Sequence, residues 1–299
     1  MFQRHKFVLA LTLCLTAAAA HADPLVYVLT DSGQFGTVDY GTGAFNAIGP
    51  GLTVSGGSLV QGLAGTFLTL TFAGDLNSIN AATGVASLIG PTGLADCTFT
   101  SSPCGPHAAG VLGNLAANVY ATDFAQNLYS VNLSTGGATL IGPTGIPPLD
   151  FIPHDSVPGD PDSIYIFDES MFGSNGKLYI DFDSGTLDLT TFTVTPLVAP
   201  ALYQINPSTG LATLVTSTPF GLSAINDVGG TPYAFSIPDS QVVTLNLTNG
   251  HTTFVSDADP SAGIINGAAS PVPEPTSLAL VGTGLAAIAT GIRRRRSSR

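Results

Sequence analysis

The chain has 299 residues, which is enough for one large domain or two ordinary ones with a hydrophobic core. It carries 8 lysines and arginines against 20 aspartates and glutamates, and Lys177 is the only Lys or Arg between residues 7 and 292. Because phosphate binding needs a surface rich in lysine and arginine, this distribution excludes nucleic acid as a partner.

Residues 1–22 have the pattern of a secretory signal peptide. Arg4 and Lys6 precede an apolar stretch from Phe7 to Ala20, and Ala20-His21-Ala22 fits a small-residue cleavage site. We therefore predict export through a Sec-type machinery and cleavage by signal peptidase, so that the mature chain begins at Asp23.

The body, residues 23–270, contains a repeated phrase of two short β-strands around a turn. The copy from Leu128 reads "LYSVNLSTGGATLIGPTG", with clear relatives from Leu76 and Leu202 and weaker ones from Phe35 and Val242. In this phrase an Asn opens the turn by bonding its own backbone ahead, and a following glycine can take a positive φ without steric cost. Each phrase is therefore predicted to form a β-hairpin.

The spacing of the phrases indicates an all-β fold of repeated units. The Asn or Asp that opens each turn serves as a marker, and successive markers are 41, 52, 74 and 40 residues apart: Asp39, Asn80, Asn132, Asn206 and Asn246. Two of these intervals are close to the ~40–45 residues of a four-stranded propeller blade. The 74-residue interval contains "KLYIDFDSGTLDLTTFTV" from Lys177, which could be a degenerate hairpin or an insertion.

The hairpins resemble those of bacterial secreted repeat proteins with the phrase "LYxINxxTGxxTLIG", and this resemblance implies a β-propeller-like fold. A β-sandwich stays open as the alternative, because the same hairpins could build one and their spacing is irregular. The resemblance indicates architecture rather than activity, since propellers carry many functions.

Two cysteines stay in the body after removal of the signal peptide. Cys97 and Cys104 lie in "CTFTSSPC", joined by a short Ser/Pro segment. In an exported chain this pattern favours a local disulfide. A metal site would need more ligands than the nearby His107.

An acidic, proline-rich segment, residues 150–169, is followed by "DFDSG". Hard oxygen ligands grouped in this way could hold calcium, the one cofactor that the sequence suggests, although the spacing is not that of an EF-hand. The alternative is a solvated acidic loop. The candidate ligands are Asp155, Asp160, Asp162, Asp181 and Asp183.

No Walker, Rossmann, zincin or G-x-S-x-G phrase occurs, and the histidines of the body are far apart in sequence. We therefore assign no catalytic residue and predict a non-enzymatic protein. Two alternatives stay open: a secreted hydrolase or lyase acting on matrix polymers, and a calcium-dependent binding module.

The C-terminal segment, residues 271–299, combines three features in order. "VPEPTS" begins at Val272, an uncharged run from 277 to 292 follows, and the basic tail 293–299 holds Arg293, Arg294, Arg295 and Arg296. A helix of 16 residues covers roughly 24 Å, which is short of a hydrocarbon core of ~30 Å. We predict a marginal transmembrane helix with a stop-transfer cluster held in the cytoplasm.

This three-part segment resembles the PEP-CTERM sorting signal. The resemblance implies that Pro273, Glu274 and Pro275 are recognised by exosortase, a membrane-embedded processing enzyme of Gram-negative bacteria with exopolysaccharide loci. It also implies that the helix is transient and that the body goes to the cell surface or the exopolysaccharide matrix of a biofilm. There we expect a structural or binding role.

Overall fold

The structure is a computed structural model of the whole chain. It describes residues 24–52, 57–63, 65–71, 73–94, 109–148, 156–157, 160–191, 193–237 and 240–270. These ranges contain the repeated hairpins and exclude the predicted signal peptide, both cysteines and the C-terminal segment. No helix in these ranges is long and apolar enough to cross a bilayer.

The described residues form five antiparallel sheets, which we name blades 1 to 5. Blade 1 contains β1 (Leu25–Thr30), β2 (Phe35–Asp39), β3 (Phe45–Ala47) and β21 (Ile265–Ala269). Blade 2 contains β4 (Val60–Gln61), β5 (Thr66–Leu70), β6 (Asp75–Asn80) and β7 (Ala86–Pro91). Blade 3 contains β8 (Ala109–Leu115), β9 (Asn118–Asp123), β10 (Asn127–Val131) and β11 (Ala138–Pro143).

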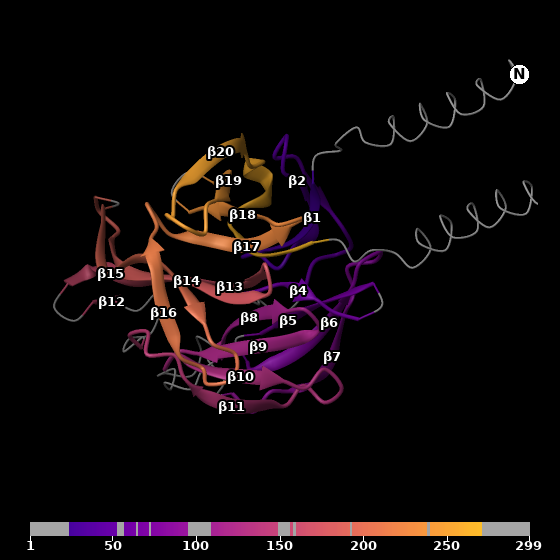
Figure 1. Ribbon diagram of the computed structural model, residues 1–299. Helices are drawn as coiled ribbons and strands as arrows, with labels where there is room; N and C mark the ends of the chain where they lie inside the picture. The colour runs from indigo at the N-terminus through magenta and orange to yellow at the C-terminus, as the bar shows by residue number, and fades with distance from the viewer. Residues whose placement is uncertain are drawn as a thin grey trace, which may run out of the picture.

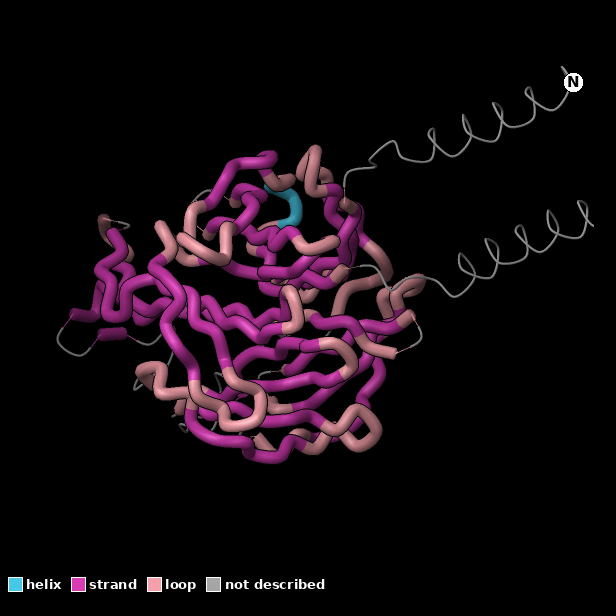
Figure 2. The backbone as a smooth tube through the Cα atoms, viewed as in Figure 1, coloured by secondary structure: helices cyan, strands magenta, loops and turns pink. Residues whose placement is uncertain are grey.

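Blade 4 has five strands: β12 (Ser156–Val157), β13 (Asp160–Ser174), β14 (Lys177–Asp188), β15 (Thr193–Ile205) and β16 (Ala212–Ser217). Blade 5 contains β17 (Leu222–Val228), β18 (Thr231–Ser236), β19 (Gln241–Leu245) and β20 (Thr252–Asp257). One 3₁₀ turn, η1 (Pro260–Ala262), precedes β21, and strands otherwise dominate the described part (Figure 2).

The blades are arranged in a ring, so the fold is a five-bladed β-propeller (Figure 1). The inner strands of neighbouring blades contact one another around the axis: β21, β4, β8, β13 and β17. The ring is closed by β21, the last strand of the described residues, which pairs antiparallel with β1 of the first blade. The propeller expectation is thus confirmed, and the β-sandwich alternative is wrong because the hairpins form five sheets rather than two facing ones.

Each repeated phrase forms the outer hairpin of one blade. In the blade 3 copy, Asn132 Oδ1 accepts the backbone N–H groups of Ser134 and Thr135 at 2.9 and 3.2 Å, while Gly136 takes a φ of 82°. The equivalent Asx turns open at the other markers, Asp39, Asn80, Asn206 and Asn246. The predicted hairpins and the turn role of the marker residue are therefore confirmed.

The glycines of the phrase also let neighbouring blades approach closely at the outer rim. The turn glycine Gly210 of blade 4 lies against Gly142 in β11 of blade 3, and a Cβ on Gly210 would be 2.5 Å from the Gly142 carbonyl oxygen. The same kind of contact recurs at every other blade boundary: Gly43 with Asp257, Gly84 with Ile48, Gly136 with Gly90, and Gly250 with Ser217. The five contacts form a rim in which backbone meets backbone, with no room for side chains.

Blade 4 departs from the repeat because its inner strands are longer. β13 and β14 pair from Ser174↔Lys177 out to Ser163↔Asp188, and β15 continues alongside β14 to Thr193. The extra length projects as a hairpin at one side of the ring, at left in Figure 1. The long interval before Asn206 is therefore an extension of the blade's own inner strands, and β14–β15 is the degenerate hairpin.

Hydrophobic clusters lie between neighbouring blades rather than in one central core. The large, fully buried side chains of the cluster between blades 3 and 4 are Leu128, Leu178, Ile180 and Phe182. Similar clusters fill the other boundaries, because alternate residues of each strand face opposite neighbours.

Candidate functional site

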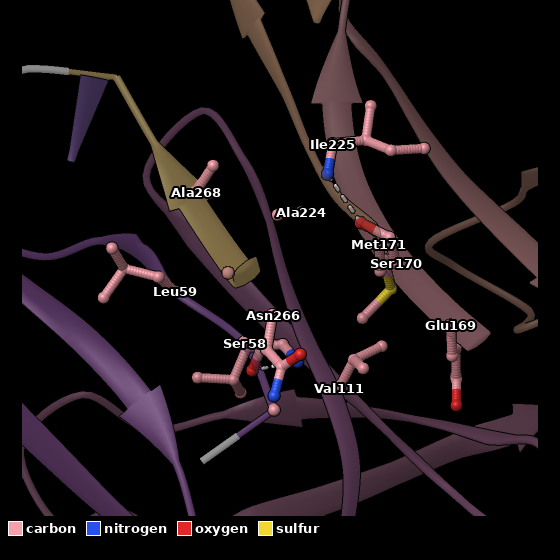
Figure 3. Close-up of a pocket in the computed structure, with 13 residues that line it drawn as sticks. Ser58, Leu59, Val111, Glu169, Ser170, Met171, Ala224, Ile225, Asn266 and Ala268 are labelled. Atoms are coloured by element: carbon pink, nitrogen blue, oxygen red, sulfur yellow. Dashed lines mark hydrogen bonds between the residues drawn. The ribbon is translucent and has the colours of Figure 1, made fainter. Parts of the chain in front are cut away.

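The axis of the propeller is nearly filled. Its cavity has a volume of about 10 Å³, which is room for about one water molecule. The Oγ of Ser170 accepts the N–H of Ile225 at 2.8 Å, and the Oγ of Ser58 accepts the N–H of Leu112 at 2.9 Å (Figure 3). Ser170 therefore links the inner strands of blades 4 and 5, and Ser58, just before β4, links blade 2 to β8 of blade 3, which leaves little space for a ligand at the level of this cavity.

The ionisable groups nearest the axis belong to the inner two strands of blade 4. In the β13–β14 pair, Asp168 lies opposite Asp183, and Ser170 lies opposite Asp181. Because side chains alternate across a sheet, these three aspartates face blade 5 while Glu169 faces blade 3. One pair of strands thus presents carboxylates to both of its neighbours.

Backbone and side-chain groups of the segment before β17 contact the aspartates that face blade 5. Asp181 accepts the Thr218 hydroxyl at 3.2 Å and the Leu222 N–H at 3.3 Å. A Cβ on Gly221 would lie 3.0 Å from Asp183 Oδ2 and 3.1 Å from Asp168 Oδ2. Gly221 therefore lets the two carboxylates lie against the backbone, and Asp168 Oδ2 is buried without a hydrogen-bond partner.

Glu169 is in the boundary between blades 3 and 4 and is 5% exposed. Its Oε1 accepts the Thr122 hydroxyl at 2.6 Å, and its Oε2 has no hydrogen-bond partner. The neighbouring Asp123 accepts the N–H of Asn127 and the hydroxyl of Tyr129, both at 2.8 Å. One oxygen of the buried Glu169 carboxyl is therefore hydrogen-bonded and the other is not, while Asp123 is held by residues that follow it in sequence.

Burial shifts these carboxyl groups toward the protonated form. It raises the pKa of Glu169 to about 7 and that of Asp183 to about 6. The pKa values of Asp168 and Asp181 are also well above the ordinary value, first through burial and then through repulsion between neighbouring carboxylates. The site therefore exchanges protons in the range where ordinary carboxyl groups are already ionised.

The structure separates the predicted calcium ligands. Asp181 and Asp183 lie beside Asp168, whereas Asp160 and Asp162 lie in the projecting hairpin, beyond the Ser163↔Asp188 pair. Asp160 instead accepts the Ser163 hydroxyl at 2.8 Å. The prediction that these four aspartates belong to one calcium site was wrong, because the extended pairing of β13 with β14 holds the two groups apart. Asp155 lies outside the described residues.

Within the described ranges, no three His, Cys, Asp or Glu side chains form a group that could hold a metal ion. The predicted disulfide between Cys97 and Cys104 lies outside those ranges. So do the sorting residues Pro273, Glu274 and Pro275, the predicted helix 277–292 and the arginine cluster 293–296.

Sequence reasoning did not single out Glu169, Asp123 and Gly221 as parts of one neighbourhood. A signal was available for one face: in "YIDFDS" the acidic residues alternate with apolar ones, which places Asp181 and Asp183 on the same side of a strand. Nothing local could show that β13 would bring Asp168 opposite Asp183.

Comparison with known proteins identifies one segment of the chain. Residues 271–296 match the PEP-CTERM protein-sorting motif, as the sequence predicted. The motif implies export of the chain and sorting by an exosortase-type membrane enzyme. No curated protein matches the chain.

Solved structures show distant likeness to the body. A structure of a nidogen/laminin complex is 9% identical, with a TM-score of 0.48 and coverage of 83% of this chain and 98% of that one. A protein of unknown function from Bacteroides thetaiotaomicron is 12% identical, with a TM-score of 0.47; the match covers 79% of this chain and 56% of that one. BamB from Moraxella catarrhalis is 16% identical with a TM-score of 0.34, over 77% and 72% of the two chains. No ligand or partner is carried over from these proteins.

Proposed function

We propose that the mature chain is a non-enzymatic structural or binding component of the outer cell surface or the exopolysaccharide matrix, delivered there by exosortase processing of its tail. The observation that carries this proposal is the PEP-CTERM motif at residues 271–296, which begins directly after the closing strand of a complete propeller. The last residue before the motif, Ser270, is still bonded to blade 5.

The form of the body favours binding on its outer surfaces. The axial cavity holds about 10 Å³, whereas a small-molecule site has a volume of roughly 300–1,000 Å³. The faces and the rim of the ring offer much larger areas, with exposed threonine, serine and asparagine side chains on the repeated hairpins. Such groups suit hydrogen bonding to the hydroxyls of a polysaccharide.

Mass spectrometry of surface-bound protein from the native host tests the sorting step. Wild-type protein should lack the peptides that end at Arg299. The triple variant Pro273→Ala/Glu274→Gln/Pro275→Ala should retain its tail and stay in the membrane fraction, while the control Thr190→Ala, exposed and outside the motif, should be processed normally. Recovery of wild-type surface protein with an intact C-terminus would refute the proposal.

Co-sedimentation of the processed protein with host exopolysaccharide tests the binding role. We expect the protein to sediment with the polymer and the polymer to keep its chain length. A fall in polymer chain length on incubation would overturn the non-enzymatic assignment in favour of a matrix hydrolase or lyase.

A further inference from the structure

Both ends of the propeller body lie at one face of the ring. Tyr27 in β1 pairs with Ala269 in β21, and the two strands are antiparallel, so the chain enters β1 beside the point where it leaves β21. We call this the tail face; it also contains the turns that follow the inner strands, namely residues 62–63 and 65, 116–117, 175–176 and 229–230. The projecting hairpin of blade 4 extends on the other side of the ring (Figure 1).

The tail face carries very few charges. Among its described turns and the residues beside them, Lys177 is exposed, and Asp227 is bonded to the Ser174 hydroxyl and the Gly230 N–H. Asp39, opposite Leu25, is half-buried and accepts the N–H groups of Gly41 and Thr42. Leu25 and Leu63 are exposed there by 46% and 67%. The surface around the exit of the tail is therefore close to neutral and partly apolar.

The opposite face, formed by the loops between the second and third strands of each blade, is acidic. Asp31 and Asp75 lie at such loops in blades 1 and 2, and Asp188 lies at the tip of the projecting hairpin. Further carboxylates on this side are accessible to solvent: Asp160 and Asp162 in the projecting hairpin, and Asp257 and Asp259 at the end of β20 and just after it. The two faces thus differ sharply in charge.

The point at which the tail leaves the body is fixed by hydrogen bonds of Ser270. The Ser270 hydroxyl donates to the Asp227 carbonyl at 2.7 Å and accepts from Asn226 Nδ2 at 3.1 Å, which fixes the chain one residue before the motif. Pro273 is three residues farther on, a distance of roughly 10 Å even for a fully extended chain. Any enzyme that reads this segment at a membrane must therefore work close against the body.

We propose that the unprocessed protein rests with its tail face on the surface of an anionic phospholipid bilayer and its acidic face directed away from it. Anionic headgroups repel carboxylates within a Debye length of ~8–10 Å, so the near-neutral face from which the tail leaves is the one that can rest on the bilayer. This orientation rests on the proposed sorting function, and it leaves the acidic face and the projecting hairpin free to meet the surroundings of the cell.

Photo-crosslinking in the full-length chain, with its tail, tests the orientation. A photo-crosslinking amino acid replaces either Asn118, exposed on the tail face, or Thr190, exposed at the tip of the projecting hairpin. With the chain in vesicles of mixed zwitterionic and anionic phospholipid, lipid adducts should form at position 118 and not at 190. Equal labelling, labelling at 190 alone, or only protein adducts at 118 would overturn the proposal.

Charge variants test the same orientation through the rate of tail removal in the host. Ala117→Glu/Thr231→Glu adds two carboxylates to the tail face, and Ser32→Glu/Thr190→Glu adds two to the opposite face as a matched control. We expect processing to slow by about fivefold per added charge in the first variant and to be unchanged in the second. Equal rates in the two variants would contradict the proposal.

The two experiments separate failure of the orientation from failure of the sorting function. If wild-type protein keeps its tail in the host, the sorting function fails, while crosslinking still reports which face contacts lipid. If the tail is removed and position 118 forms no lipid adduct, sorting stands and the orientation is wrong.

Discussion

The outer rim of the propeller and the inner end of blade 4 are built in opposite ways. The rim repeats one contact five times, and that contact consists of backbone groups, turn amides and glycines; the one acidic side chain among the turn markers is Asp39. The inner end of blade 4 occurs once and gathers carboxyl groups that burial pushes toward protonation. Repetition therefore accounts for the contacts between neighbouring blades at the rim, whereas the buried carboxyl groups occur in one blade alone.

The largest expected effect comes from adding one methyl group at the rim. Gly210→Ala should lower the free energy of unfolding by about 2–5 kcal/mol, because the residue has a φ of 86° and its Cβ would meet the Gly142 carbonyl. Urea unfolding followed by circular dichroism measures the change.

Two control variants separate the causes. Gly145→Ala has a positive φ of 77° but nothing within 4 Å of the new Cβ, so it reports backbone strain alone. Gly142→Ala has an ordinary φ, and its Cβ would lie 2.5 Å from the Thr209 carbonyl oxygen, so it reports the clash. If Gly210→Ala lowers the free energy of unfolding no more than Gly145→Ala does, the contact between Gly210 and Gly142 is not tight enough to exclude a methyl group.

The rim also shows what sequence patterns can and cannot reveal. The marker Asn and the turn glycine are four residues apart, so the hairpin and its turn chemistry are visible in the phrase itself. The second glycine of the phrase, such as Gly142, is required by a contact with the backbone of a different blade. That backbone is more than sixty residues away in sequence, so no local pattern reveals the contact. The sequence left the number of blades open for the same reason, because the extension of β13 to β15 stretches one interval without adding a unit.

The grouping of the acidic residues into one calcium site failed for the same reason, because it rested on local sequence alone. Proximity in sequence placed Asp160 and Asp162 with Asp181 and Asp183, but the register of a long hairpin decides which residues meet. The residue opposite Asp183 is Asp168, and the reach of Glu169 into blade 3 depends on the closure of the whole ring.

A medium effect is expected at the inner end of blade 4. The pKa of Glu169 is raised from an ordinary 4.5 to about 7, so the native state holds more protons than the unfolded state between these values. The free energy of unfolding should therefore fall as the pH rises through this window, and Glu169→Gln should remove that fall. At pH 8 the variant should be more stable than wild type by roughly 1–3 kcal/mol.

The same variant provides its own control at acid pH. Below about pH 4 the Glu169 carboxyl is protonated in both folded and unfolded chains, so wild type and Glu169→Gln should unfold at nearly equal denaturant concentrations. Asp183→Asn should act in the same direction over a lower window, since burial raises the pKa of Asp183 to about 6. A constant difference between wild type and Glu169→Gln across the whole pH range would contradict a titrating carboxyl.

The smallest effect tests whether the marker asparagine acts through its turn. Asn132→Ala removes the acceptor of two backbone N–H groups and should cost about 1–2 kcal/mol, whereas Asn132→Asp, the residue found at marker position 39, should cost much less. Ser134→Ala keeps the backbone N–H that Asn132 accepts and leaves the turn intact, so it should be nearly neutral. Because Thr135 and Gly136 of this turn contact Gly90 of blade 2, Asn132→Ala should also reduce the cost of a later Gly90→Ala substitution. A double-mutant cycle that gives strict additivity would show that the turn and the rim contact are independent.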